Sequence, residues 1–269
     1  MLLTRIPQLA YGIMAEMIRA RRAGGGRARD FADRRAALSM VAEWLTKPWK
    51  ERPDLRIVDY VGMEDLHWYM VTDKLAARAI TSLQHVPGDV IECGTYQGNS
   101  LLQLAFAMRR AGRFAEGRRL YACDSFQGLP EPGPEDVDRE PQPHPLKHVG
   151  GYASPQDLVE TRLRRYGFQN DVTLVPGWFE DTLPTLQHLR FAIIFLDVDL
   201  YESYRTCLRY LFPLLSPGGV IFFSDYNGSY WPGCNKAVDE YFAGTEYEVT
   251  ACPFFERWAF VQKPLESRG

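Results

Sequence analysis

From about residue 88 onward, short apolar runs alternate with segments whose apolar residues recur at helical spacing. The strongest run is Phe191–Leu196, which is apolar at every position and therefore typical of a strand covered on both faces in a parallel sheet. The pattern predicts strands over 89–94, 120–124, 172–175, 191–196 and 219–223, and helices over 98–110, 155–166, 203–215 and 235–242. This alternation requires right-handed crossovers, so we expect an α/β domain.

Two late strands are predicted over 247–252 and 257–262. The connection between them is too short for a parallel crossover, so they should pair antiparallel. The prediction is then a seven-stranded, mostly parallel sheet with helices on both faces. At the helix starts, we expect Asn99 and Ser100 to cap the 98–110 helix and Ser154 to cap the 155–166 helix.

The first part of the chain has a different pattern. Residues 3–18 carry apolar side chains close to helical spacing and are followed by arginines and a glycine run. Such a helix usually docks on its own domain or on a partner subunit, so membrane contact is not expected. No run is long enough to span a bilayer. We predict further helices over 31–45 and 63–83. We also expect the chain to have two parts. The first is an N-terminal helical extension over 1–60, which would serve docking, oligomerisation or as a lid, and the second is a main domain over 61–269.

Composition fits this picture and narrows it. A chain of 269 residues with 46% hydrophobic and 24% charged residues suits one globular α/β domain with a modest addition. Residues 1–36 carry an excess charge of +5 within a net charge of −3, so the remainder is acidic and offers no surface for nucleic acid. The cysteines form no CxxC pair, which indicates reduced structural thiols and a cytoplasmic location.

Carboxylates follow two neighbouring strands of the predicted sheet. Asp197 and Asp199 come after the 191–196 run, and Ser224 and Asp225 come after the 219–223 run. The carboxyl ends of such strands meet at one edge, and an extended backbone would put Asp197 and Asp199 on the same face. These oxygen ligands suit Mg²⁺. The alternative is that the acids only precede a helix capped at Ser203.

The loop after the first predicted strand carries Gly94 and Gly98, separated by three residues rather than in the GxGxxG spacing. These glycines let the backbone approach a ligand and leave a helix N-terminus free for a negative group. For S-adenosylmethionine that group would be the methionine carboxylate, while Glu92 could meet the ammonium. The candidate cofactor residues here are Glu92, Gly94, Thr95, Tyr96, Gly98, Asn99 and Ser100.

Two further segments could contact a cofactor. Asp124 ends the second strand, before Ser125 and Phe126, where an acid can accept both ribose hydroxyls or can simply cap a turn. After the third strand, Gly177 is followed by Trp178 and Phe179, aromatic side chains that could stack on adenine or be buried. The proline-rich, acidic segment 130–151 has no periodicity and is expected either to fold over the site or to be a surface insertion.

Six segments in order resemble the macrocin O-methyltransferase (TylF-like) family of class I S-adenosylmethionine-dependent methyltransferases, over about residues 60–262. They are residues 92–95, 124–130, 177–184, 196–203, 224–226 and 233–240. The resemblance implies a Rossmann-like fold, S-adenosylmethionine and Mg²⁺ as cofactors, and methylation of hydroxyls, typically on the sugars of macrolide and aminocoumarin antibiotics. It also implies a homodimer or higher homo-oligomer.

Carried across by motif, the resemblance makes Asp197 and Asp225 metal ligands and Asp199 the general base. It assigns contacts with the cofactor to Glu92, Asp124 and the region of Trp178. It also assigns one to Asp197, on the methyl-donor side. The family usually has two consecutive aspartates before the Tyr-Gly pair, whereas this chain has Ser224 before Asp225. Ser224 offers a neutral oxygen, so a weaker metal affinity is expected.

The expected function is therefore Mg²⁺-assisted, S-adenosylmethionine-dependent O-methylation of a small natural product in secondary-metabolite biosynthesis, with a sugar hydroxyl as the first choice of acceptor. Two alternatives stay open. A phenol or catechol acceptor would need less basic catalytic groups to remove its proton, because phenols ionise near pH ~10. A cofactor-binding partner subunit without catalysis is slightly favoured by Ser224 and opposed by the intact Asp197 and Asp199.

Overall fold

The computed structural model describes residues 76, 79–137, 144–252 and 258–265. The predicted extension over 1–60, the predicted helix over 31–45 and most of the helix over 63–83 lie outside the described residues. Within the described residues, no helix combines the length and the apolarity that crossing a bilayer requires.

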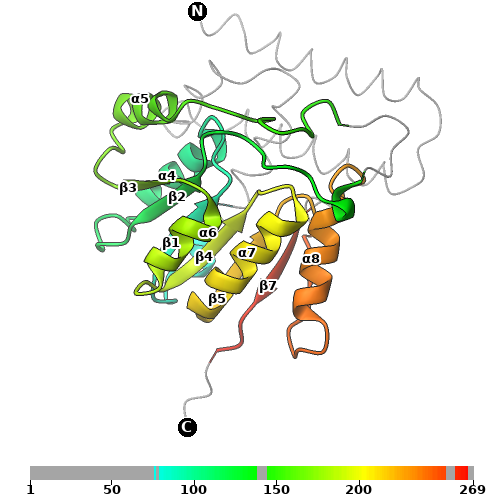
Figure 1. Cartoon of the computed structure of the whole chain (residues 1–269). Helices are drawn as coiled ribbons and strands as arrows, with labels where there is room; N and C mark the ends of the chain where they lie inside the picture. Colours follow the sequence, from blue (N-terminus) through cyan, green and yellow to red (C-terminus); the bar gives the residue numbers. More distant parts are fainter. Residues whose placement is uncertain (1–75, 77–78, 138–143, 253–257, 266–269) are drawn as a thin grey trace, which may run out of the picture. The chain divides into compact units, whose positions relative to one another are not determined.

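The described part of the chain forms one seven-stranded sheet in the order β3-β2-β1-β4-β5-β7-β6 (Figure 1). Strands β1 to β5 are parallel, and β7 runs antiparallel to both β5 and β6. This confirms the predicted mostly parallel sheet and its antiparallel return. The strands are β1 Asp89–Cys93, β2 Leu120–Asp124, β3 Val172–Pro176, β4 Phe191–Leu196, β5 Leu215–Phe223, β6 Thr250–Ala251 and β7 Ala259–Gln262.

Helices cover both faces of this sheet. From β1 the chain moves outward first through β2 and β3 and later through β4 and β5, so right-handed crossovers place the helices of the two halves on opposite faces. Figure 1 shows α7 and α8 side by side on one face. The helices are α4 Asn99–Arg110, α5 Gln156–Tyr166, α6 Phe179–Thr182, α7 Tyr201–Leu211 and α8 Pro232–Phe242, with short 3₁₀ turns η4 Pro134–Asp136, η5 Leu183–Leu186 and η6 Phe212–Leu214.

Strand β4 is the centre of the core and leads to the candidate site. All of its residues are buried, as the continuous apolar run predicted. Tyr204 of α7 is fully buried and its hydroxyl donates to the carbonyl of Leu196, the last residue of β4, at 3.1 Å. Burying each large apolar side chain of β4 stabilises the fold by roughly 1.5–3 kcal/mol. The point at which β4 ends is therefore held firmly. The five cysteines are buried and none of them forms a disulfide, which agrees with the prediction of structural thiols.

Several predicted boundaries are wrong. The helix predicted over 203–215 begins earlier, at Tyr201, and its α-helical part ends at Leu211, because Pro213 cannot donate the next backbone hydrogen bond. Residue Leu215 already belongs to β5. Helix α8 begins at Pro232 rather than 235, since proline is well tolerated in a first helical turn. Helix α6 was not predicted, and β6 has only two residues.

The predicted caps are also wrong. Gly98 occupies the N-cap of α4 with a left-handed backbone (φ 79°) and no side-chain cap, and Asn99 is the first helical residue. Ser100 instead hydrogen bonds to the buried Glu92 carboxyl. Pro155, not Ser154, is the N-cap of α5, and no side chain caps that helix.

Candidate active site

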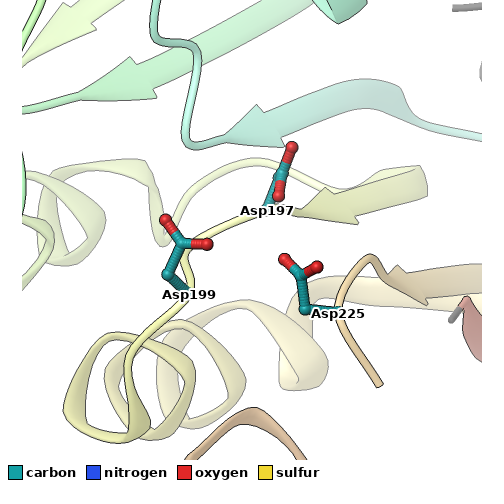
Figure 2. A group of neighbouring side chains, drawn as sticks. All are labelled: Asp197, Asp199 and Asp225. Carbon is teal, nitrogen blue, oxygen red and sulfur yellow. The ribbon is translucent and has the colours of Figure 1, made fainter. Parts of the chain in front are cut away.

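Three acids converge at the carboxyl ends of β4 and β5 (Figure 2). Asp197 and Asp199 follow β4, and Asp225 follows β5, whose last residue Phe223 pairs with Leu196. One carboxylate oxygen from each acid lies within 4.8 Å of those of the other two. Parallel neighbouring strands ending at the same level thus bring together the side chains that the sequence placed at one sheet edge.

The position of Asp199 has a different cause from the predicted one. We expected an extended backbone to carry Asp197 and Asp199 on one face, but β4 ends at Leu196 and Asp199 has a left-handed backbone with φ 57°. For a residue other than glycine this conformation costs about 1–2 kcal/mol. A turn, not the pleat of a strand, points the Asp199 carboxylate back toward the other acids.

Ser224 lies between two of the carboxylates. It is fully buried, and its backbone N–H donates to the Leu196 carbonyl at 3.0 Å, which extends the pairing of β4 and β5. Its Oγ lies 2.5 Å from Asp197 Oδ1 and 3.1 Å from Asp225 Oδ2. A neutral donor in this place relieves the repulsion between the two carboxylates, and the site carries three acids rather than four.

The acids have perturbed proton affinities. Burial raises the pKa of Asp197 to about 6, the Ser224 hydrogen bond opposes this rise, and the charge of Asp124 adds to it. The pKa of Asp199 is raised well above its usual range, first by burial and then by the charges of Asp225 and Asp197. Crowding three acids in a buried site thus makes them bind protons more tightly than isolated carboxylates do, as is common at functional sites.

Gly94 brings the end of β1 against this acid cluster. Its φ is 87°, and a Cβ at this position would lie 1.8 Å from the backbone oxygen of Asp197. The Asp197 N–H donates to the Cys93 carbonyl at 2.9 Å. No residue with a side chain could follow the same path, so the glycine that we predicted to contact a ligand is also required by the packing of β1 against the turn after β4.

Glu92 is a buried acid next to the predicted cofactor loop. Burial raises its pKa to about 8, a hydrogen bond from Ser100 lowers it, and the charges of Asp197 and Asp124 raise it further. Among the described residues no hydrogen-bond partner reaches Glu92 Oε2 or Asn99 Oδ1. Buried acceptors without a partner are costly, and the ammonium of S-adenosylmethionine is a cationic donor of the kind that would satisfy them. These residues therefore fit that cofactor.

Asp124 joins two loops of the site. Its Oδ2 accepts the backbone N–H groups of Thr95 at 2.7 Å and Tyr96 at 2.8 Å, and its Oδ1 accepts that of Phe126 at 2.7 Å. The turn-capping interpretation is thus confirmed. The three bonds leave one lone pair on Oδ1, which is open to a ribose hydroxyl of a nucleoside. Ser125 closes the turn, since its Oγ donates to the Gly128 carbonyl at 3.1 Å.

The segment after β3 lies beside the same edge. The N–H of Gly177 donates to the backbone carbonyl of Asp124 at 2.9 Å, which places Trp178 next to the end of β2. Trp178 is half-buried at the N-cap of α6. Phe179 packs against the hydrophobic core. Of the predicted aromatic pair, Phe179 therefore serves the core, and half-buried Trp178 remains the candidate to stack on a base.

Sequence reasoning missed residues of the segment 130–151 and of the turn before α8. The ring of His144 stacks on that of Tyr152 with centroids 6.0 Å apart and lies 5.2 Å from that of Trp231. The ammonium of Lys147 lies 4.6 Å from the Trp231 ring, and its charge lowers the pKa of Asp199. Within an aperiodic loop no local signal distinguished these side chains from solvated ones.

The chain has a class I methyltransferase fold. This follows from the strand order, the antiparallel β7 and the acids after β4 and β5. The calicheamicin methyltransferase CalS11 shares this fold with a TM-score of 0.63 over 90% of this chain and 95% of that chain, at 20% identity. The model of the macrocin O-methyltransferase (TylF) family matches residues 71–250, and this chain belongs to that family. The resemblance found in the sequence is thus confirmed.

Individual relatives are named as O-methyltransferases. The chain is 42% identical over 159 residues to the 8-demethyl-8-(2,3-dimethoxy-alpha-L-rhamnosyl)-tetracenomycin-C 4'-O-methyltransferase of Streptomyces olivaceus, covering 58% of each chain. It is 35% identical over 160 residues to the demethyldecarbamoylnovobiocin O-methyltransferase of Streptomyces niveus, covering 58% of this chain and 59% of the relative. The matches thus span less than two thirds of these two relatives. The structure of the O-methyltransferase NovP matches with a TM-score of 0.60 and 30% identity over 73% of this chain and 79% of that chain.

Proposed function

We propose that this protein is an S-adenosylmethionine-dependent, Mg²⁺-assisted O-methyltransferase that methylates a hydroxyl, in first place on a sugar, of a small natural product in secondary-metabolite biosynthesis. The observation that carries the proposal is the contact between Gly94 and Asp197, which sets the predicted cofactor loop directly against the three acids. Family membership and relatives named for O-methylation support it, and one of those names includes a rhamnosyl group.

In this proposal the cofactor lies along the ends of β1 and β2. Glu92 would accept the ammonium of the methionine part, and the backbone N–H groups at the start of α4 would meet its carboxylate. Asp124 would accept a ribose hydroxyl at Oδ1, and Trp178 would stack on the adenine. The methyl group would then face Asp197 and the neighbouring acids, because Gly94 holds the two loops together.

The chemistry assigned to the site is a direct displacement. When bound, S-adenosylmethionine would supply an electrophilic methyl group: the acceptor oxygen would bond to the methyl carbon, the electron pair of the carbon–sulfur bond would go to sulfur, and S-adenosylhomocysteine would be the leaving group. The hydroxyl proton passes to the Asp199 carboxylate, which a bound cation beside it would keep ionised until the transfer. The half-buried position of Asp199 keeps this carboxylate within the acid cluster.

The donor set also fits Mg²⁺, which binds carboxylate oxygens and retains water. Asp197 and Asp225 would hold the ion, with Ser224 Oγ as a neutral neighbour and Asp199 within reach. When bound, the ion would lower the pKa of the acceptor hydroxyl and compensate the repulsion among the acids.

An acceptor with a ring fits the neighbouring wall. The charges of Asp199, Asp225 and Asp197 all act on the phenol of Tyr152, so its ring lies beside the acid cluster. The ring of Tyr96 meets it edge-on with centroids 5.4 Å apart. Aromatic faces of this kind pack well against the apolar face of a sugar or against a phenol.

The test is a turnover assay of the full chain with S-adenosylmethionine, Mg²⁺ and a panel of sugar-bearing and phenolic natural products. Mass spectrometry would read the gain of one methylene. Methylation of sugar hydroxyls is the expected result, and methylation confined to phenols would move the acceptor class to the alternative. No product from any acceptor, with S-adenosylmethionine bound, would contradict the proposal and favour a partner subunit without catalysis.

We further propose a homodimer or higher homo-oligomer, which follows from the family resemblance. Sedimentation of the full chain and of a chain lacking residues 1–60 would test both this assembly and the assignment of the N-terminal extension to it. A monomeric full chain would contradict the expectation.

A further inference from the structure

A buried carboxylate connects the segment after β2 with the first turn of α7. Asp136, at the end of η4, is only 2% exposed, although the next residue, Val137, is 69% exposed. Its Oδ1 accepts the backbone N–H of Tyr201 at 2.8 Å, and its Oδ2 accepts that of Gly133 at 2.9 Å. A carboxylate is buried at little cost only when hydrogen bonds replace its water, and these two bonds do so.

The bond to Tyr201 replaces a missing helix cap. Tyr201 is the first residue of α7, and its N-cap, Leu200, has no side chain that can cap the helix. The first N–H groups of a helix lack partners within the helix, and here a carboxylate 65 residues earlier accepts one of them. The negative charge also lies at the positive end of the helix dipole.

The start of α8 leaves the space that this carboxylate fills. A Cβ on Gly233 would lie 1.9 Å from Asp136 Oδ1 and 2.9 Å from the backbone nitrogen of Tyr201. Glycine is therefore required at this position for Asp136 to reach α7. Three segments that are distant in the sequence, η4, α7 and α8, meet at this one carboxylate.

The backbone of Asp136 makes a second contact, with Lys147. The ammonium of Lys147 donates to the backbone carbonyl of Asp136 at 2.9 Å and also to that of Tyr230. At its base the segment is closed by backbone bonds, from Leu129 to the Gly151 carbonyl at 2.7 Å and from Gly150 to the Leu129 carbonyl at 2.9 Å. Asp136 and Lys147 are thus two described residues of this segment that bond to each other away from this base.

Asp199 stands two residues before Tyr201, in the left-handed turn that leads into α7. We infer that Asp136 is a positioning residue of the proposed active site. By holding the Tyr201 N–H it determines where the turn places the Asp199 carboxylate, and its backbone carbonyl accepts a hydrogen bond from Lys147, whose ammonium lies over the Trp231 ring. The inference rests on the proposed function, since it assigns Asp136 to the placement of the proton acceptor of that reaction.

The first test compares Asp136→Ala, Asp136→Asn and, as a matched control, Glu131→Ala in the full chain. Glu131 is an exposed acid of the same segment. Displacing a catalytic group by about 1 Å can cost roughly 100-fold, so kcat with the acceptor should fall at least roughly 10-fold in Asp136→Ala. The Kd for S-adenosylmethionine should change by less than about twofold, because the loops of Asp124 are untouched. Asp136→Asn, which keeps the oxygen toward Tyr201, should recover part of the loss, and Glu131→Ala should behave as wild type.

A second variant perturbs the same contact from α8. Gly233→Ala keeps the Asp136 residue but puts a methyl group where its carboxylate lies, so the carboxylate must move away from Tyr201. This variant should therefore reproduce the selective loss of kcat with intact binding of S-adenosylmethionine. It also covers the case in which Asp136→Ala does not fold. Equal losses of kcat and of cofactor affinity in Asp136→Asn and Gly233→Ala would indicate a general structural role and would overturn the inference.

Hydrogen exchange gives a reading that needs no acceptor. In Asp136→Ala the amides of Tyr201 and Gly133, which now lack their acceptor, should exchange faster than in wild type, and those of β1 should not. If wild type transfers no methyl group, the proposed function fails while this measurement still reports on the contact. Wild-type exchange at Tyr201 together with wild-type kcat would show that Asp136 positions nothing.

Discussion

The hydroxyl of Ser224 lies 2.5 Å from the carboxylate of Asp197 and joins the ends of β5 and β4 at the centre of the proposed active site. In the family resemblance this position belongs to a second aspartate. The serine keeps the two strand ends in contact and halves the number of acids that β5 presents. It therefore lowers the negative charge of the proposed metal site.

Restoring an acid at this position should strengthen metal binding. We expect Ser224→Asp to raise the Mg²⁺ affinity by roughly tenfold, because it adds an anionic oxygen to a site that prefers such ligands. Titration calorimetry with Mg²⁺ measures this directly. Ser224→Ala, which lacks the hydroxyl, serves as the control and should bind Mg²⁺ no better than wild type. Equal affinity in all three proteins would remove position 224 from the metal site.

Asp199→Asn should abolish most turnover. An amide cannot accept the hydroxyl proton, and the loss of a general base usually costs roughly 100-fold or more. Binding of S-adenosylmethionine, measured by calorimetry, should be unchanged, since Asp199 lies in the acid cluster and not beside Glu92 at the end of β1. Asp181→Asn, at an exposed position of α6, is the matched control. A variant with wild-type kcat would exclude Asp199 as the base.

Binding of S-adenosylmethionine should release a proton from Glu92. Without cofactor its pKa of about 8 leaves it mostly protonated at pH ~7, and pairing with the ammonium should lower that pKa. Calorimetry in buffers of different ionisation enthalpy measures the released proton. Glu92→Gln should release none and bind more weakly, whereas Glu248→Gln, at an exposed site, should match wild type.

The same group makes stability depend on pH. The folded-state pKa of Glu92 is raised, so between its ordinary value of 4.5 and about 8 the folded protein binds more protons than the unfolded chain. The cofactor-free protein should therefore lose stability as pH rises through this window, and lose it less in Glu92→Gln. Urea denaturation from pH ~5 to ~9 is the measurement. Parallel curves for the two proteins would contradict the assignment.

Gly94→Ala should be strongly destabilising. The new Cβ would lie 1.8 Å from the Asp197 backbone oxygen, in a left-handed conformation, so β1 and the turn after β4 must separate. We expect a loss of more than about 3 kcal/mol in the free energy of unfolding. Gly112→Ala is the matched control, because its φ is 71° and nothing lies within 4 Å of the added carbon, and it should cost about 1–2 kcal/mol.

The fold could be predicted largely because its signals are local. The apolar run of Phe191–Leu196 specifies a strand by itself, and the alternation around it specifies a parallel sheet. The wrong predictions concern positions at which a residue distant in the sequence determines the hydrogen bonding. Ser100 does not cap α4, because the buried Glu92 takes its hydrogen bond. Ser154 does not cap α5 either, and Pro155 stands at the N-cap in its place.

Asp136 marks the limit of what the chain reveals by itself. Within an aperiodic segment it looks like its neighbour Glu131, yet one acid is buried and the other exposed. The difference comes from Tyr201 and Gly233, which supply a donor and an open space only after α7 and α8 have packed together.

The sequence by itself determined the sheet, the strand ends at which chemistry could occur, the family, and the acids Asp197, Asp199 and Asp225. Only the tertiary structure decided that a left-handed turn directs Asp199 to the other two, that Ser224 bridges two strand ends, and that a distant segment anchors the turn. Apolar periodicity is written in neighbouring residues, whereas the position of a buried polar group depends on partners that meet it only in the folded chain.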